Sequence, residues 1–142
     1  NLGVEPLTSD FSETYLYVRS RKKVQNIKAF IMDSKVVVGV GNIYACECLF
    51  ASGINPIREA GSISKARYKK LTQNIKQILE HAIKAGGTTL QDFSQVDGSP
   101  GYFAQTLNVY GRESQQCITC SGKIQRLIQN QRSTFYCKNC QS

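Results

Sequence analysis

Apolar residues recur with a helical period most clearly in the middle of the chain, between residues 65 and 84. Their spacings of three, four and seven place them on one face of a helix. The residues on that face are Leu71, Ile75, Ile78, Leu79, Ala82 and Ile83. Ser64 can cap the start of this helix, and Gly86 with Gly87 can end it. The pattern therefore predicts the longest helix of the chain.

Two shorter helices are expected before it. Ser9 and Asp10 supply a capping signal for a helix over residues 11–18. Its apolar members are Phe11, Tyr15, Leu16 and Val18. A second apolar stretch with helical spacing covers residues 27–32. These segments can pack on the long helix as a small bundle.

A glycine turn leads into a further helix at Asn42. The apolar segment 36–40 passes through Gly39 and Gly41 into Asn42, which can cap a helix that Gly53 ends. Such a start leaves backbone N–H groups at the positive end of a helix, where a phosphate oxygen can bind. An ordinary buried joint between a strand and a helix fits the same residues, because short glycine motifs are weak signals.

Two Cys-x-x-Cys pairs lie near the end of the sequence, separated by sixteen residues: Cys117 with Cys120, and Cys137 with Cys140. This spacing is typical of four thiolates around one tetrahedral zinc ion. Four protein ligands leave no open coordination position, so we expect one structural Zn²⁺ that does not itself activate water. Two disulfides in a secreted protein are the alternative interpretation.

The residues between the two cysteine pairs predict a β-hairpin. Residues 123–128 carry apolar side chains, residues 133–136 are rich in β-formers, and residues 129–132 form a polar tip. The metal is expected to hold the base of this hairpin, with the tip facing outward.

Charge gives the first indication of a partner. The 142 residues carry a net charge of +8, and the basic residues gather in runs at 19–28, at 65–76 and from 117 onward, where no acid occurs. A polyanion, and nucleic acid first, fits this distribution, although a solvated basic surface has the same composition. The sequence holds no apolar run of about 18 residues and no secretory leader, so we expect no membrane partner and a reducing cytoplasm.

The remaining candidates for chemistry are weaker. His81 is the only histidine, and a helical histidine without a nearby ligand partner is usually a surface or boundary residue. Cys46 and Cys48 lie two apart on a helix, so they point to different faces and are expected to be core or boundary thiols. Residues 88–102 form a glycine-rich polar segment, which predicts a surface loop.

Several ordered motifs together resemble the bacterial formamidopyrimidine-DNA glycosylase family over essentially the whole chain. They are Gly39-Val-Gly-Asn42-Ile-Tyr-Ala, Gly86-Gly-Thr-Thr, Pro100-Gly-Tyr-Phe, Val109-Tyr-Gly-Arg112 and Arg132-Ser-Thr-Phe-Tyr-Cys137. The resemblance implies a mainly α fold, with a helix-two-turn-helix bundle followed by a small four-cysteine zinc β-hairpin. It divides the chain into a linker at 1–8, a DNA-binding domain at 9–111 and a zinc finger at 112–142.

The resemblance also gives roles to individual residues. Asn42, Lys23 and Tyr110 would bind the phosphate beside a damaged nucleotide. Arg132 would grip the phosphates that flank it, because a planar guanidinium can hold two oxygens at once. The family credits this arginine with proton donation in δ-elimination, but an arginine scarcely gives up a proton near neutral pH, so electrostatic positioning is the expected role.

The loop at 88–102 would fold over the extruded base. The residues implied at the base edge are Thr88, Gln91, Asp92 and Phe93. Such a loop has to admit the flipped nucleotide before it closes. Relatives often carry a lysine or arginine where this chain has Gln91, and a neutral amide there is expected to weaken contacts with the lesion.

The family's nucleophile is an amino-terminal proline helped by an adjacent glutamate, and this sequence has no Pro-Glu start. The expectation is a full-length parent that removes oxidised purines such as 8-oxoguanine and formamidopyrimidines and cleaves the abasic site by β,δ-elimination, whereas the present chain is inactive alone. Its expected partners are double-stranded DNA with an oxidised purine or abasic site and the missing amino-terminal domain. We expect a monomer in the bacterial cytoplasm, associated with the nucleoid.

Two alternatives remain at this point. The endonuclease VIII branch shares the scaffold but prefers oxidised pyrimidines, and residues 88–102 favour the purine enzyme. The second alternative is a non-catalytic zinc-ribbon module that binds RNA or a protein partner. The helical half of the chain argues against it, because a simple zinc ribbon does not need those helices.

Overall fold

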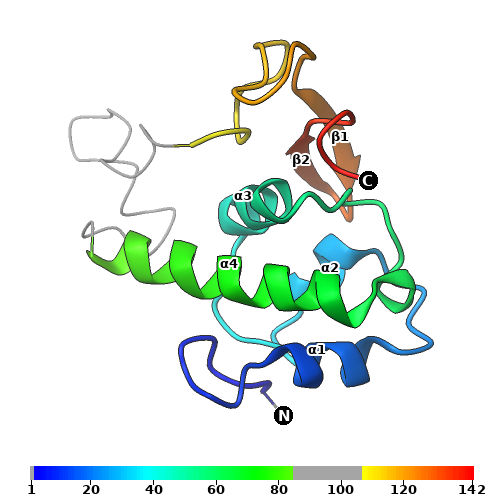
Figure 1. Cartoon of the computed structure of the whole chain (residues 1–142), viewed down its shortest axis with the longest axis vertical. Coiled ribbons are helices and arrows are strands. Elements are labelled where there is room, and N and C mark those ends of the chain that lie inside the picture. Colours follow the sequence, from blue (N-terminus) through cyan, green and yellow to red (C-terminus); the bar gives the residue numbers. More distant parts are fainter. Residues whose placement is uncertain (1, 85–106) are drawn as a thin grey trace.

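The computed structural model describes residues 2–84 and 107–142, so the expected loop at 88–102 lies outside the described residues. Helices α1 (Glu13–Ser20), α2 (Ile27–Met32), α3 (Asn42–Ser52) and α4 (Lys65–Lys84) precede an antiparallel hairpin, and a short 3-10 helix η1 (Ala60–Ser62) leads into α4. The hairpin strands are β1 (Gln125–Gln129) and β2 (Arg132–Tyr136). The fold is therefore the predicted helical bundle followed by a small β-hairpin (Figure 1).

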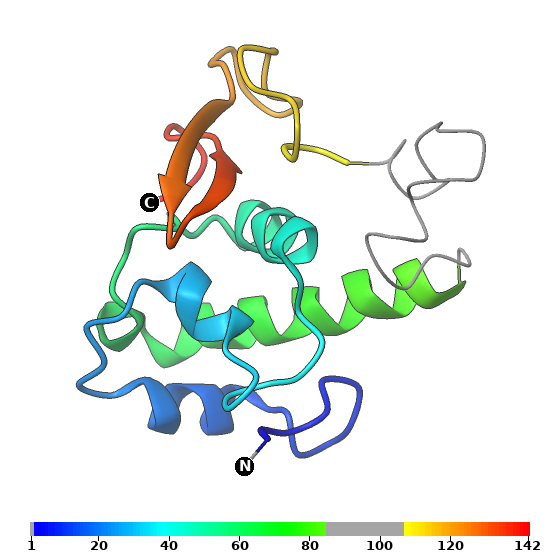
Figure 2. The same ribbon diagram turned by 180° about the vertical axis from the view of Figure 1, so that it is seen from behind.

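The core of the bundle lies between α4 and the other helices. Helix α4 crosses the molecule with α1 on one side and α3 on the other, and α2 lies in front of it when the molecule is seen from behind (Figure 2). The large side chains of Phe11, Phe30 and Tyr68 are fully buried there. No helix within residues 2–84 and 107–142 is long and apolar enough to cross a membrane.

The predicted apolar face of α4 is confirmed except near its end. Leu71, Ile75, Leu79 and Ala82 are buried, whereas Ile83 is 51% exposed. Ala82 in the same turn is buried, so the buried face of α4 continues to this point and Ile83 lies beside it. Ser64 caps this helix as predicted, since its Oγ accepts a hydrogen bond from the Arg67 N–H at 3.2 Å.

The first helix begins later than the sequence suggested. Ser12, rather than Ser9 or Asp10, is the N-cap, and its Oγ accepts the Tyr15 N–H at 3.1 Å. Val18, which was expected on the apolar face, is 64% exposed, whereas Leu16 and Ser20 lie on the side of α1 that is buried. The second helix has the predicted bounds.

The segment before α1, expected to be a linker, is held against the bundle. The Gly3 N–H donates to the Ser34 carbonyl at 2.7 Å, and the Val38 N–H donates to the Val4 carbonyl at 3.0 Å. A Cβ at Gly3 would collide with the backbone of Val36. Glycine at this position therefore permits the close approach of two backbone segments.

Helix α3 starts and ends at glycines. Gly41 is its N-cap and Asn42 is its first helical residue, so the expectation that Asn42 caps the helix is wrong. Gly53 ends the helix as predicted, in the left-handed conformation with φ of 71°. All of the residues from Asn42 to Phe50 are buried, because α4 covers one side of α3 and β2 covers another.

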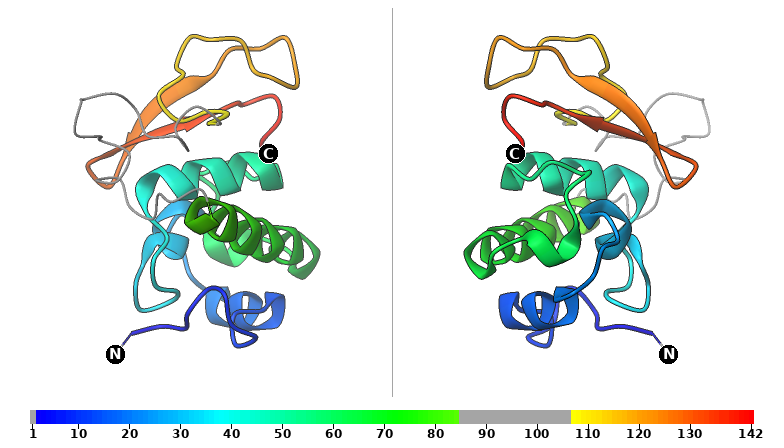
Figure 3. Two further views of the ribbon diagram at one scale, coloured as in Figure 1. Left: turned by 90° about the vertical axis from the view of Figure 1, so that its left-hand side faces the viewer. Right: turned by 90° about the vertical axis from the view of Figure 1, so that its right-hand side faces the viewer.

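The hairpin tip is exposed at Asn130, Gln131 and Arg132, as expected, but it also contacts the bundle, because the Asn26 Nδ2 donates to the Asn130 Oδ1. Gln129 pairs with Arg132, which leaves a two-residue turn at Asn130 and Gln131 with φ of 51° and 66°. The hairpin lies across α3, and its tip reaches the beginning of that helix (Figure 3). Phe135 of β2 is buried in an apolar cluster with Cys46 and Phe50 of α3. Burial of this face of β2 draws the hairpin onto the bundle.

Candidate metal centre and nucleic-acid interface

The four cysteines of the two Cys-x-x-Cys pairs converge at the base of the hairpin. Their Sγ atoms all lie within 4.8 Å of one another. The distance between Cys117 and Cys140 is 3.8 Å, and that between Cys120 and Cys137 is 3.5 Å. A tetrahedron of sulfurs about 2.3 Å from zinc has edges of about 3.8 Å, so the donor set fits one structural Zn²⁺. All four cysteines are free, which contradicts the disulfide alternative.

The electrostatics of the cluster agree with a cation at its centre. Burial alone raises the pKa of the Cys117 thiol, but hydrogen bonds from Thr119 and neighbouring groups lower it to about 6. Burial raises the pKa of Cys137 to about 12. The Cys117 thiolate is thus stabilised mainly by hydrogen bonds from Thr119, whereas further thiolates repel one another at these distances. A divalent cation removes that repulsion.

The polypeptide around the cluster is tied to the bundle as well as to itself. The Gln141 Oε1 accepts the Cys137 N–H at 2.7 Å, and the Gln141 Nε2 donates to the Ile54 carbonyl at 2.9 Å. The Arg67 guanidinium donates to the Gly53 carbonyl at 2.7 Å and to the Ser142 carbonyl at 2.9 Å. The metal site is therefore held against the end of α3.

At the opposite end of the hairpin, Asn42 faces β2. Its side chain is 7% exposed, and its Nδ2 donates to the Ser133 carbonyl at 3.0 Å. Its Oδ1 is buried and has no hydrogen-bond partner among the described residues. Asn42 thus links the first turn of α3 to the residue next to Arg132, and it retains an unused polar atom at this junction.

Lys28 of α2 reaches the same junction. Its side chain is 2% exposed, and its Nζ donates to the Ser133 carbonyl at 3.2 Å and to the Thr134 hydroxyl at 2.6 Å. Burial lowers the pKa of Lys28, Cys46 opposes that shift and the Arg132 guanidinium adds to it. The junction is therefore electropositive, with one buried and one exposed cation.

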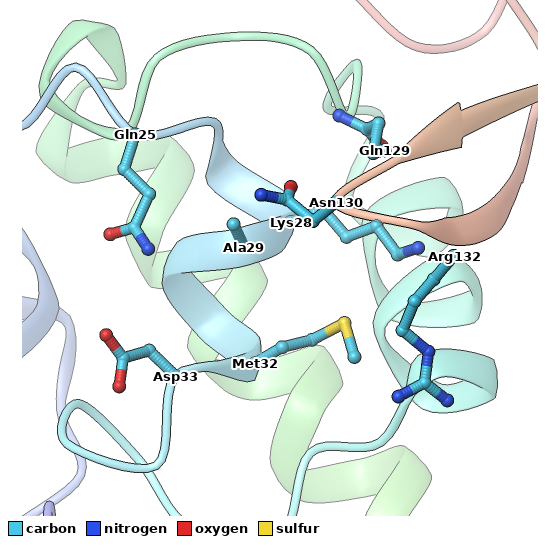
Figure 4. A pocket seen from close by; sticks show the side chains of 8 residues that line it. All are labelled: Gln25, Lys28, Ala29, Met32, Asp33, Gln129, Asn130 and Arg132. Carbon is cyan, nitrogen blue, oxygen red and sulfur yellow. The ribbon is translucent and has the colours of Figure 1, made fainter.

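Arg132 is the exposed cation of this junction. It is the first residue of β2, directly after the turn, and within the described parts of the chain its side chain forms no hydrogen bond. It lines a pocket of about 280 Å³ between α2 and the hairpin tip, together with Ala29, Met32 and Asp33 (Figure 4). A guanidinium in this position is available for an oxyanion such as phosphate.

Lys23 and Tyr110, the other two residues expected to bind DNA, lie in different surroundings. Lys23 is exposed in the loop between α1 and α2, and no described contact joins it to Asn42 or Arg132. The Tyr110 ring packs edge-on against Phe135, with ring centroids 4.8 Å apart. Tyr110 therefore supports the hairpin as part of its apolar cluster.

Glu47 holds the segment that carries Tyr110, and sequence reasoning gave it no role. Its carboxylate is 5% exposed and accepts the N–H groups of Asn108, Val109 and Tyr110 at 2.8, 2.9 and 2.9 Å. A lone carboxylate inside the apolar run of α3 was the available signal, because a buried charge requires partners. Lys28 gave the same signal between Ile27 and Phe30.

The other expectations have different outcomes. Cys46 and Cys48 are buried thiols, and His81 is exposed, as predicted. The proposed base-edge residues Thr88, Gln91, Asp92 and Phe93 lie outside the described residues.

Two family descriptions match the chain. Residues 2–94 match "Formamidopyrimidine-DNA glycosylase H2TH domain", and residues 114–142 match "Zinc finger found in FPG and IleRS". Among curated relatives, the sequence is 68% identical to the formamidopyrimidine-DNA glycosylase of Ruthia magnifica, covering 100% of this chain and 53% of that protein. The chain thus spans about half the length of the curated relatives it matches.

Solved structures agree with these matches. The fold is similar to Lactococcus lactis Fpg in complex with abasic-site DNA, with a TM-score of 0.88 and 33% identity over 99% of this chain and 52% of that one. Another complex of L. lactis Fpg contains an oxidised pyrimidine in its DNA, with a TM-score of 0.87 and 33% identity over 99% and 51%. The MutM (Fpg) protein of Thermus thermophilus has a TM-score of 0.87 and 36% identity over 99% and 53%.

Proposed function

The chain belongs to the formamidopyrimidine-DNA glycosylase family, and from this we propose that it is the damaged-DNA-binding half of a base-excision-repair glycosylase and abasic-site lyase. The observation that carries the proposal is the junction at the hairpin tip. Asn42 and Lys28 both donate to the Ser133 carbonyl, and the residue directly before Ser133 is the exposed Arg132. The fold thereby presents a cation at a fixed place beside the start of α3.

A phosphodiester backbone is the ligand that this junction suits best. Arg132 can donate two parallel hydrogen bonds to phosphate oxygens. The amide of Asn42 can donate to a phosphate oxygen, since its Nδ2 carries two hydrogens and the Ser133 carbonyl is its one partner among the described residues. We propose that these two residues hold the backbone on either side of an extruded nucleotide, with Lys23 and Tyr110 contributing from the surrounding surface.

The nucleophile is proposed to come from the part of the full-length protein that corresponds to the other half of its relatives. Pro6, Pro56 and Pro100 carry amide nitrogens, which are not basic and cannot attack a sugar carbon. The zinc site has four protein ligands and no position for a reacting water. The residues of this chain therefore bind and orient DNA, and strand cleavage by β,δ-elimination belongs to the complete enzyme.

Oxidised purines are the proposed substrates, with Thr88, Gln91, Asp92 and Phe93 at the base edge. The alternative is an oxidised pyrimidine, which is favoured by the DNA in one of the L. lactis complexes. Fusion of the chain to the amino-terminal half of the R. magnifica relative, followed by cleavage assays on 8-oxoguanine and thymine-glycol duplexes, separates the two. Cleavage of neither duplex by a folded fusion would overturn the enzymatic proposal.

DNA binding itself is tested by fluorescence anisotropy of the zinc-loaded chain with an abasic-analogue duplex. We expect Arg132→Ala to weaken binding by about tenfold and to reduce the salt slope by about one. Arg19→Ala is the matched control, because it removes a guanidinium from α1, which lies on the opposite side of the bundle from the hairpin (Figure 1). Equal effects of the two substitutions would show that Arg132 contributes only general charge.

A further inference from the structure

We propose that Asn26 is a positioning residue for Arg132, through a hydrogen bond that fixes the turn at the hairpin tip. The proposal rests on the phosphate-binding role proposed for Arg132. Asn26 lies 104 residues from Asn130 in the sequence, and its Nδ2 donates to the Asn130 Oδ1 at 3.1 Å. This contact joins the beginning of α2 to the turn immediately before Arg132.

The Asn26 side chain has a defined orientation. It is the N-cap of α2, and its Oδ1 accepts the Ala29 N–H at 2.8 Å. Since only the oxygen of the amide can accept that hydrogen bond, the Nδ2 has to point toward Asn130. One side chain therefore caps the helix and holds the turn at the same time.

The backbone on both sides of Asn26 is also fixed. The Ile27 N–H donates to the Arg58 carbonyl at 2.7 Å, and the Ala60 N–H donates to the Gln25 carbonyl at 2.9 Å. Asn26 is thus anchored to Arg58 and to the first residue of η1, and it cannot follow the turn if the turn moves. It acts as a fixed point on the bundle.

The turn transmits this constraint to Arg132 over a very short distance. Asn130 and Gln131 are the only residues between the paired positions Gln129 and Arg132. Both have positive φ, so their backbone conformations are restricted. A displacement of Asn130 therefore changes the direction in which the Arg132 side chain leaves the backbone.

The neighbouring pocket makes this constraint necessary. The pocket of about 280 Å³ lies between α2 and the tip, and the Met32 side chain points across it toward Arg132 (Figure 4). No side-chain hydrogen bond within residues 2–84 and 107–142 holds Arg132 in one rotamer. Its direction is set by its backbone. Asn26 secures the turn at Asn130, and the Gln129 Nε2 bond to the Pro56 carbonyl secures the end of β1.

Two single substitutions test the proposal in different ways. Asn26→Ser keeps an N-cap oxygen but is too short to reach Asn130. Asn130→Gly leaves the cap intact, removes the acceptor and suits the positive φ of the turn. Each is expected to weaken binding of the abasic-analogue duplex by about threefold to tenfold, and the double variant by no more than the larger single effect.

The matched control is Gln131→Gly, which places a glycine at the other turn position without touching the contact. It is expected to leave the affinity within about twofold of the original protein, because an Asn-Gly sequence suits this type of turn. Zinc content and the thermal unfolding midpoint of every variant verify that the hairpin is still folded. If Asn130→Gly and Gln131→Gly weaken binding equally, turn flexibility explains the result and the proposal is wrong.

The decisive experiment measures the effect of Asn26→Ser on duplex binding again, this time in the Arg132→Ala protein. If Asn26 acts through Arg132, Asn26→Ser has no further effect on DNA affinity once Arg132 is absent. An unchanged effect of Asn26→Ser in that protein would overturn the positioning role. If Arg132→Ala alone leaves binding unchanged, it is the DNA-binding role of Arg132 that fails, so the two proposals fail in distinguishable ways.

Discussion

The ammonium of Lys28 donates a 2.6 Å hydrogen bond to the hydroxyl of Thr134, so a charged side chain from α2 ends inside the hairpin. Both residues are buried, and Thr134 is fully so. The helical bundle and the hairpin are therefore joined by a polar contact that water does not reach.

This pair is expected to behave as a coupled unit. Thr134→Val removes an acceptor from a buried cation and should lower the free energy of unfolding by about 1–3 kcal/mol. The same substitution in a Lys28→Met protein should be close to neutral, because the partner that needs the hydroxyl is gone. Urea unfolding of the four proteins measures the coupling. Additive effects would contradict a direct contact.

Glu47 should stabilise the protein through its three backbone hydrogen bonds. Glu47→Gln leaves one carbonyl oxygen and directs an NH₂ group toward N–H donors, so we expect a loss of about 1–3 kcal/mol in the free energy of unfolding. Glu80→Gln is the control, since Glu80 is exposed and its one contact of this kind among residues 2–84 and 107–142 is a 3.8 Å ion pair with Lys84. Glu80→Gln should alter the free energy of unfolding by no more than about 0.5 kcal/mol. Comparable losses in both variants would count against the proposed role of Glu47.

Alkaline pH should destabilise the bundle through Tyr68. Burial raises the pKa of this residue to about 12, and its hydroxyl donates to the Ala60 carbonyl at 2.8 Å. The folded protein therefore keeps the proton that the unfolded chain loses near pH 10. The contribution of Tyr68 to the free energy of unfolding is complete below about pH 10. It decreases by on the order of 3 kcal/mol as the pH rises through about 12.

The test is urea unfolding of the original protein and of Tyr68→Phe at pH 9 and pH 11. The phenylalanine variant should show a smaller loss of stability over this interval, because it has no phenol to ionise. Burial also raises the pKa of the Cys48 thiol, so a part of the loss persists in the variant. Identical losses in both proteins would exclude the contribution of Tyr68.

Removal of zinc should unfold the hairpin and leave most of the bundle folded. The apolar cluster around Cys117, Ile124 and Phe135 is distinct from the main core, so the helices retain their own burial. We expect one zinc ion per chain by native mass spectrometry, and loss of the hairpin amide signals in NMR spectra after chelation. Cys120→Ser should lose the metal, whereas Cys48→Ala should retain it. Retention of hairpin signals without metal would contradict the structural role.

The features that local sequence could predict are those set by nearby residues. The apolar period of Leu71, Ile75 and Leu79 specifies which side of α4 is buried, and Gly53 and Ser64 mark helix ends through their own backbone and side-chain chemistry. The two Cys-x-x-Cys pairs specify a metal site because the spacing itself brings the thiols together.

The contacts that local sequence could not predict join distant segments. The polar residues at 129–132 predict an exposed tip, but they do not reveal that Asn26 holds Asn130. Nor do they reveal that Lys28 and Asn42 donate to β2 next to the tip. Glu47 and Asn108 are 61 residues apart, so their contact exists only once the hairpin lies on α3. Polarity along the sequence cannot distinguish a residue facing water from one facing a polar partner.

The attachment of the hairpin at both ends has a consequence for the speed and selectivity of DNA binding. The metal site fixes its base and the bundle fixes its tip, so the backbone of Arg132 is ordered during folding, before any DNA arrives. Association then has to restrict only the guanidinium side chain, which lowers the entropy lost on binding. A hairpin that cannot bend also cannot adapt to a duplex of a different shape. We therefore expect DNA that is already kinked to dissociate most slowly.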